Sequence, residues 1–134
     1  MSLRGRCLCG GVRFVVDAPF ENVAHCHCTT CKQIAGGPGT TSIRAPSAAV
    51  EIVAGADLLH TFQPDEGSAK TFCSACGANL FGGGWPDSEH ASIRVTALED
   101  VPDRPLAAHI WTRSLAAWET LPDDGAERFE RGRP

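Results

Sequence analysis

The sequence predicts a mainly β fold, built from short antiparallel strands and few short helices. Fourteen glycines and nine prolines are spread over 134 residues, which favours many turns over long helices. Between these turn-forming residues lie short runs rich in β-branched and aromatic side chains. No linker, repeat or low-complexity segment divides the chain, so we expect one domain over residues 1–134.

The strand candidates follow one another along the chain, each bounded by glycine, proline or other turn-forming residues. In chain order they cover residues 4–6, 11–16, 40–44, 50–53, 58–62, 70–72, 79–81, 91–96 and 107–111. Residues 82–86 are expected to form a loop, and residues 98–103 a turn or a single helical turn.

Two short helices are expected. The first has Cys31 in its first turn, because Thr30 and Gln33 form a capping-box pattern, and it ends at the glycine pair 36–37. The second is expected at residues 114–118. The charged tail at 122–134 is expected to be extended or frayed.

Charge and hydrophobicity exclude several classes of partner. The net charge is −4 and no block of like charges occurs, so the sequence indicates neither a nucleic-acid surface nor a basic membrane patch. The N-terminus has no apolar run behind its charges, and no later segment approaches the length of a membrane-spanning helix. We therefore expect a soluble, cytoplasmic protein with neither nucleic acid nor membrane as a partner.

Seven cysteines are the strongest chemical signal in the chain. A reducing compartment disfavours a disulfide framework, and an odd number of thiols cannot pair completely, so metal ligation is the better explanation. The simplest division is four plus three. The four-cysteine cluster, which combines a C-x-C turn with a distant C-x-x-C turn, consists of Cys7, Cys9, Cys73 and Cys76.

This four-cysteine cluster would close a tetrahedral zinc site and tie the N-terminal turn to a zinc knuckle far along the chain. Closing such a loop through zinc contributes on the order of 10 kcal/mol of apparent folding free energy. We therefore expect a structural zinc here. The alternative is a set of unmetallated thiols.

The remaining thiols, Cys26, Cys28 and Cys31, form a three-cysteine cluster within six residues. In an extended segment Cys26 and Cys28 point the same way, and Cys31 opens a helix whose N-terminus, with Lys32, favours its thiolate. Three thiolates with an open fourth position are typical of a reactive zinc site. The alternatives are a second structural zinc completed by His27, or buried free thiols.

Three segments carry these cysteines in a recognisable order: Gly5-Arg6-Cys7-Leu8-Cys9-Gly10 with Val12 and Phe14, Cys26-His27-Cys28-Thr29-Thr30-Cys31, and Phe72-Cys73-Ser74-Ala75-Cys76-Gly77. Together they resemble the three signatures of the glutathione-dependent formaldehyde-activating enzyme family. Further on, Pro105, His109-Ile110-Trp111 and Trp118 are similar to that family's closing pattern. The resemblance covers a family core of about residues 5–118.

The resemblance implies a fold like that of the Mss4 group, with small coiled antiparallel sheets around a structural zinc. It assigns that zinc to the four-cysteine cluster and a second, catalytic zinc to the three-cysteine cluster. The implied activity is condensation of glutathione with formaldehyde to S-hydroxymethylglutathione, formally a carbon-sulfur lyase reaction run backwards. The implied partners are a small-molecule thiol and an aldehyde.

An open zinc would either lower the pKa of a bound thiol or polarise the aldehyde carbonyl, and the formal −1 charge of a three-thiolate site favours thiol delivery. Lys32 and Arg44 are candidate basic groups for an anionic peptide substrate. Two other functions stay open: a non-catalytic, zinc-stabilised binding module, and a redox or zinc-responsive switch.

The other notable side chains have simpler explanations. The loop at 82–84 is not a phosphate loop, because no Lys-Ser or Lys-Thr follows it, and it is expected to be flexible and to border the pocket. Three histidines are expected to be ordinary strand residues, and three tryptophans core or rim aromatics. They are His60, His90 and His109, and Trp85, Trp111 and Trp118.

Overall fold

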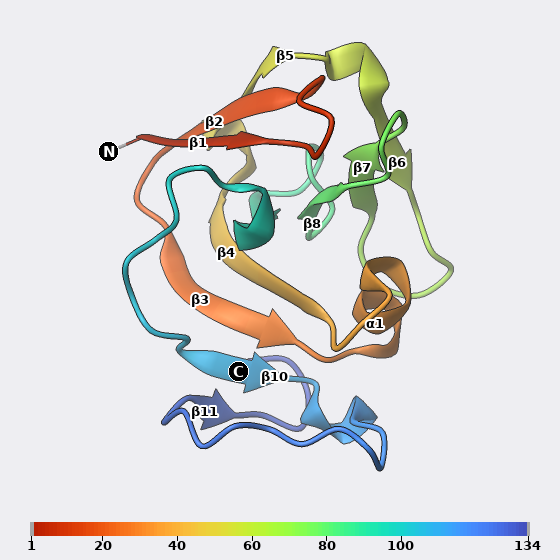
Figure 1. Cartoon of the computed structure of the whole chain (residues 1–134), viewed down its shortest axis with the longest axis vertical. Helices are drawn as coiled ribbons and strands as arrows, with labels where there is room; N and C mark the ends of the chain where they lie inside the picture. The colour runs from red at the N-terminus through yellow and green to blue at the C-terminus, as the bar shows by residue number, and fades with distance from the viewer. Residues whose placement is uncertain (1, 134) are drawn as a thin grey trace.

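The computed structural model describes residues 2–133 and contains a three-stranded sheet and an eight-stranded sheet (Figure 1). In the three-stranded sheet, β2 (Arg13–Asp17) lies between β1 (Ser2–Arg6) and β5 (Val50–Ala54), and both pairings are antiparallel. A tight turn joins β1 to β2, and Gly10 adopts a left-handed backbone there, with φ of 79°. The mainly β prediction is therefore confirmed.

The eight-stranded sheet has the strand order β11-β10-β3-β4-β9-β8-β7-β6. Its central pairings are antiparallel, whereas β10 runs parallel to both β3 and β11. The strands are β3 (Glu21–Cys26), β4 (Thr40–Pro46), β6 (Leu59–Phe62), β7 (Lys70–Cys73), β8 (Asn79–Gly82), β9 (His90–Arg94), β10 (Ala108–Ile110) and β11 (Glu127–Arg128).

Helical structure is sparse, as the composition predicts. The α-helix α1 (Thr29–Ala35) follows β3 directly and ends at Gly36, whose left-handed backbone closes the last turn. Within residues 2–133 no helix has the length and apolar character needed to cross a membrane. Short 3₁₀ turns are η1 (Ser47–Ala49), η2 (Ala56–Leu58), η3 (Val95–Ala97) and η4 (Thr112–Ser114).

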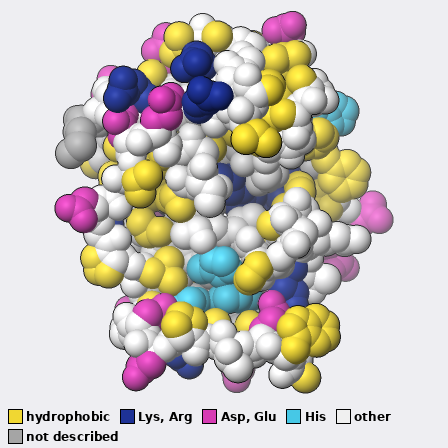
Figure 2. Space-filling view, in the orientation of Figure 1, with side chains coloured by type: hydrophobic (Ala, Val, Ile, Leu, Met, Phe, Trp, Pro, Cys, Tyr) yellow, Lys and Arg dark blue, Asp and Glu magenta, His cyan; other side chains and the backbone are white. Residues whose placement is uncertain are grey.

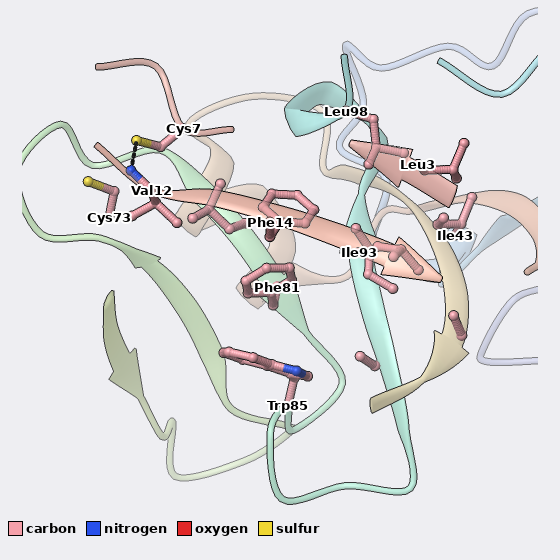
Figure 3. Close-up of a cluster of buried hydrophobic side chains, with 14 of the residues drawn as sticks. Leu3, Cys7, Val12, Phe14, Ile43, Cys73, Phe81, Trp85, Ile93 and Leu98 are labelled. Atoms are coloured by element: carbon pink, nitrogen blue, oxygen red, sulfur yellow. Dashed lines mark hydrogen bonds between the residues drawn. The ribbon is translucent and has the colours of Figure 1, made fainter. Parts of the chain in front are cut away.

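The hydrophobic core lies between the two sheets (Figure 3). Phe14 from β2 meets Phe81 from β8 edge to face, with ring centroids 4.9 Å apart, and Trp85 packs on Phe81 at 4.4 Å. Such aromatic contacts bury large apolar areas and hold the sheets together. Cys7 and Cys73 lie at one end of this core, so the four-cysteine cluster is continuous with it.

The eight-stranded sheet has one apolar and one polar face because side chains alternate along each strand. Ile43, Phe81 and Ile93 lie opposite one another on β4, β8 and β9 and face the core. The residues adjacent to these on each strand face the other way. Ser42 on β4 and Arg94 on β9 are such a pair and lie opposite each other. This polar face positions the candidate site.

The C-terminal part of the chain differs from the prediction. The prediction of a helix at 114–118 is wrong. The 3₁₀ turn η4 ends at Ser114, and Leu115 is already extended. Of the tail predicted at 122–134, residues 122–133 are described, and they are held in place because β11 pairs with β10 (Figure 1). In addition, the amides of Trp111 and Arg113 donate to the carbonyls of Arg131 and Glu130.

Candidate metal and active site

The β1–β2 turn and the β7–β8 turn bring the four-cysteine cluster together across the sequence. All four Sγ atoms lie within 4.8 Å of one another, with Cys7 and Cys9 3.5 Å apart and Cys9 and Cys73 4.0 Å apart. Around a tetrahedral zinc with bonds of about 2.3 Å, sulfur atoms are about 3.8 Å apart. The cluster therefore has the dimensions of a closed four-thiolate metal site and is compatible with zinc.

Backbone amides favour thiolates in this cluster. The Val12 amide donates to Cys7 Sγ at 3.2 Å, and the Ala78 amide helps to lower the pKa of Cys76 to about 6 (Figure 3 shows the first of these bonds). The Gly11 amide is the largest influence on Cys9 and lowers its pKa, but the Cys7 thiol, burial and the other two thiols together outweigh it and raise the pKa to about 11. Four close thiols cannot all ionise unless a cation shares their charge.

The three-cysteine cluster lies where β3 ends and α1 begins. Cys26 is the last residue of β3, Cys28 is the N-cap of α1, and Cys31 is in its first turn. Their three Sγ atoms lie within 4.8 Å of one another, and all seven cysteines of the chain are free thiols. This second cluster is also compatible with a metal ion.

The cap of α1 differs from the prediction. Cys28, not Thr30, is the N-cap, and its Sγ accepts the Cys31 amide at 3.4 Å. The expected capping box is wrong because the helix begins at Thr29, one residue before the predicted cap. The Thr30 hydroxyl lies 3.2 Å from Cys28 Sγ, where it hydrogen-bonds to the sulfur.

These contacts separate the thiols by acidity. A hydrogen bond from Cys26, followed by one from Cys31, holds the pKa of Cys28 far below the ordinary thiol value. The same bond raises the pKa of Cys26, because ionisation there would place two negative sulfurs side by side.

A cavity of about 1040 Å³ opens beside the three-cysteine cluster. The polar face of the eight-stranded sheet forms one wall, and residues from α1, η4 and the neighbouring loops complete the lining. The strand residues that line it include Cys26, Thr40, Ser42, Ser92, Arg94 and Lys70.

Arg94 is the most deeply buried charged residue named for this wall and is only 4% exposed. It donates to the side-chain oxygens of Asn79, Thr40 and Ser42, while its Nη2 has no partner within residues 2–133. Burial lowers the pKa of this guanidinium, and the three cysteines oppose that shift because their negative charge stabilises the cation. The same attraction stabilises the thiolates.

Sequence reasoning missed Arg94. The available signal was a cation inside a strand that also carries buried isoleucine, since a buried charge needs a partner. The two candidates it named instead, Lys32 and Arg44, are each paired with a glutamate: Lys32 with Glu119 at 2.9 Å and Arg44 with Glu21 at 3.0 Å.

The histidines form a buried polar chain instead of a metal ligand set (Figure 2 shows histidine side chains gathered near β3 and β10). His27 Nε2 lies 2.9 Å from His109 Nδ1, and His109 Nε2 lies 2.8 Å from Asp124. With His109 donating to the carboxylate, its Nδ1 accepts from His27. His109 is therefore more than the ordinary strand residue expected, since it links the loop between Cys26 and Cys28 to the tail.

The tryptophans have three different surroundings. Trp85 is in the core, Trp118 is exposed, and Trp111 lines the cavity. Trp111 is the non-glycine residue with a left-handed backbone in the described chain, at φ of 59°. Its amide donates to the Arg131 carbonyl, so the tail fixes this unusual conformation.

The fold and the site define a small, β-rich protein with two cysteine clusters that could hold metal ions. A family model described as glutathione-dependent formaldehyde-activating enzyme matches residues 2–114. The chain therefore belongs to the glutathione-dependent formaldehyde-activating enzyme family.

Two relatives are similar over almost their whole length. A protein of Halomonas elongata that carries the family's name is 29% identical over 143 aligned residues, which cover 100% of this chain and 90% of the relative. A crystal structure of a Rhodobacter sphaeroides protein has a TM-score of 0.62 at 22% identity and covers 96% of this chain and 99% of that one. The second likeness supports the fold.

Proposed function

We propose that this chain is a zinc-dependent carbon-sulfur lyase-type enzyme that joins, or splits, a small-molecule thiol and an aldehyde. The prototype reaction is that of glutathione with formaldehyde to give S-hydroxymethylglutathione. The observation that carries the proposal is the three-cysteine cluster, whose thiols converge at a cavity while residues 2–133 supply no fourth ligand to it. The family supports glutathione and formaldehyde as substrates.

Each cysteine cluster has a separate task in this proposal. The four-cysteine cluster would hold a structural zinc against the core, and the three-cysteine cluster would hold the catalytic zinc beside the cavity. When bound, this zinc supplies a lowered thiol pKa or a polarised carbonyl. The seven free thiols are also what we expect of a protein in the reducing cytoplasm.

Residues of the cavity wall would stabilise the negative charge that the reaction places on sulfur. As the new carbon–sulfur bond forms, the carbonyl electron pair moves to oxygen, and the proton lost by the thiol ends on that oxygen. Arg94 stabilises the negative sulfur by its buried positive charge, and the Thr30 hydroxyl hydrogen-bonds to Cys28. The cavity wall keeps the reacting groups together.

The uncatalysed reaction is itself fast, so the test measures exchange between free formaldehyde and glutathione at equilibrium. The zinc-loaded protein should accelerate this exchange, and a Cys28→Ser variant of equal fold and equal structural zinc should not. Equal exchange with both proteins would remove the enzymatic proposal and leave the binding-module interpretation.

A further inference from the structure

Besides Arg94, the cavity wall contains a second buried cation, Lys70, which no carboxylate of residues 2–133 neutralises. Resting on the function proposed above, we propose that Lys70 is the anion-binding residue of a remote subsite, which selects thiols carrying a carboxylate several bonds from the sulfur. Lys70 lies in β7, at the far side of the cavity from the cysteines.

Burial makes Lys70 unusual among the basic residues. Lys70 is only 6% exposed, and its ammonium donates to the Ser68 carbonyl at 3.1 Å, which satisfies one of its three N–H groups. In the described part of the chain, no carboxylate pairs with it. Taking an ammonium out of water is costly unless a counter-charge compensates, so this position favours an anionic ligand.

The other charges of the cavity leave this place to a ligand. Arg44 and Glu21 neutralise each other at 3.0 Å. Glu66, on the loop before β7, and Arg133, near the C-terminus, also line the cavity, but both are exposed. Arg94 is beside the cysteines and is matched by their negative charge. Lys70 is thus the buried cation of the wall whose charge has no counterpart within residues 2–133.

Strand order and register separate the two ends of the ligand. Lys70 in β7 and Cys26 in β3 line the same cavity, with strands β8, β9 and β4 between them. The pairings also place Lys70 level with Arg44 and Cys26 level with Thr40, which are four residues apart on β4. A ligand that reaches both groups therefore carries its charge many bonds from its sulfur.

Within the proposed function, Lys70 therefore favours thiols that carry a remote negative charge, as the prototype glutathione does. A small neutral thiol would reach the cysteines but not Lys70. The sulfur end and the anionic end would thus be recognised by separate groups, on β3 with α1 and on β7 respectively.

The test is calorimetric titration of the zinc-loaded full chain with two matched thiols. Glutathione and its diethyl ester share one thiol and one backbone, but the ester lacks both negative charges. We expect the wild type to bind glutathione about tenfold more tightly, the range of one hydrogen bond to a charged group. The Lys70→Met variant should lose this preference, and Lys70→Arg should keep it.

Arg44→Met is the matched control, since it removes an exposed cation of the same lining that already has a partner, and the preference should persist. The ester comparison in the wild type needs no variant, so a misfolded Lys70→Met protein does not stop the test. Equal binding of the two thiols by the wild type would overturn the Lys70 subsite and leave the proposed function intact. Failure of the zinc-loaded protein to bind either thiol would overturn both.

Discussion

Replacing Arg94 by methionine removes the buried charge beside the three-cysteine cluster while keeping a side chain of similar length. A thiol that binds there as thiolate brings one more negative charge next to the guanidinium. We therefore expect the Arg94→Met protein to bind thiols more weakly, whatever charge the thiol carries elsewhere.

The size of this effect follows from the pairing of the strands. Thr40 lies directly opposite Cys26 on the next strand, and Arg94 Nη1 donates to the Thr40 hydroxyl at 3.2 Å. Opposite side chains start about 5 Å apart, so the guanidinium is about 8 Å from the cluster. Two unit charges at about 8 Å, with an effective dielectric constant of about 20, attract by about 2 kcal/mol, or about 30-fold in affinity.

The assay is titration of the zinc-loaded proteins with 2-mercaptoethanol, which has no remote charge. Arg94→Lys should keep most of the affinity. Gly82→Ala should lose part of it, because the new Cβ would stand 2.5 Å from Nη2 and displace the guanidinium. Unchanged affinity in a folded Arg94→Met protein with normal zinc content would refute this electrostatic role.

Three further predictions concern stability and pH. Cys73→Ser should lower the unfolding temperature by more than about 10 °C in a thermal scan, and by much more than Cys28→Ser, because Cys73 anchors the structural cluster in the core. Asp124→Asn weakens the acceptor of His109, so amide exchange measured by mass spectrometry should accelerate at residues 127–131 and stay unchanged in α1. Hydrogen bonds from Arg4 depress the pKa of Asp100 to about 2. The ionised Asp100 therefore stabilises the fold fully above its ordinary pKa of 3.8, and this stabilisation is lost as pH falls through 2. Acid unfolding curves of Asp100→Asn should therefore show a smaller loss of stability between pH 4 and 2 than the wild type.

The local features of the fold could be predicted from the sequence. Glycine and proline mark the turns, so the strands at 70–72 and 79–81 and the helix end at Gly36 were predicted to within a residue or two. The grouping of the cysteines was predictable because each C-x-C or C-x-x-C turn brings its own pair together. The assignment of metals to these groups stays a prediction.

Features that depend on distant strands could not be predicted in this way. Arg94 meets Thr40 and Ser42 only because β9 pairs with β4 in one register, and a slip of one residue would turn it towards the core. His109 lies beside His27 because β10 pairs in parallel with β3. This pairing joins segments more than eighty residues apart, so local sequence patterns do not predict it. Both residues sit in sequences that look like ordinary strands.

The short strand β11 has a consequence for how the protein should be handled. It covers the outer edge of β10, and an uncovered β-strand edge is a template for pairing with another chain. A chain cut after residue 114, where the family match ends, would lose β11 and expose that edge close to the three-cysteine cluster. Such a shortened protein should be prone to aggregation, so a purification tag is better placed on the N-terminal side, away from this strand.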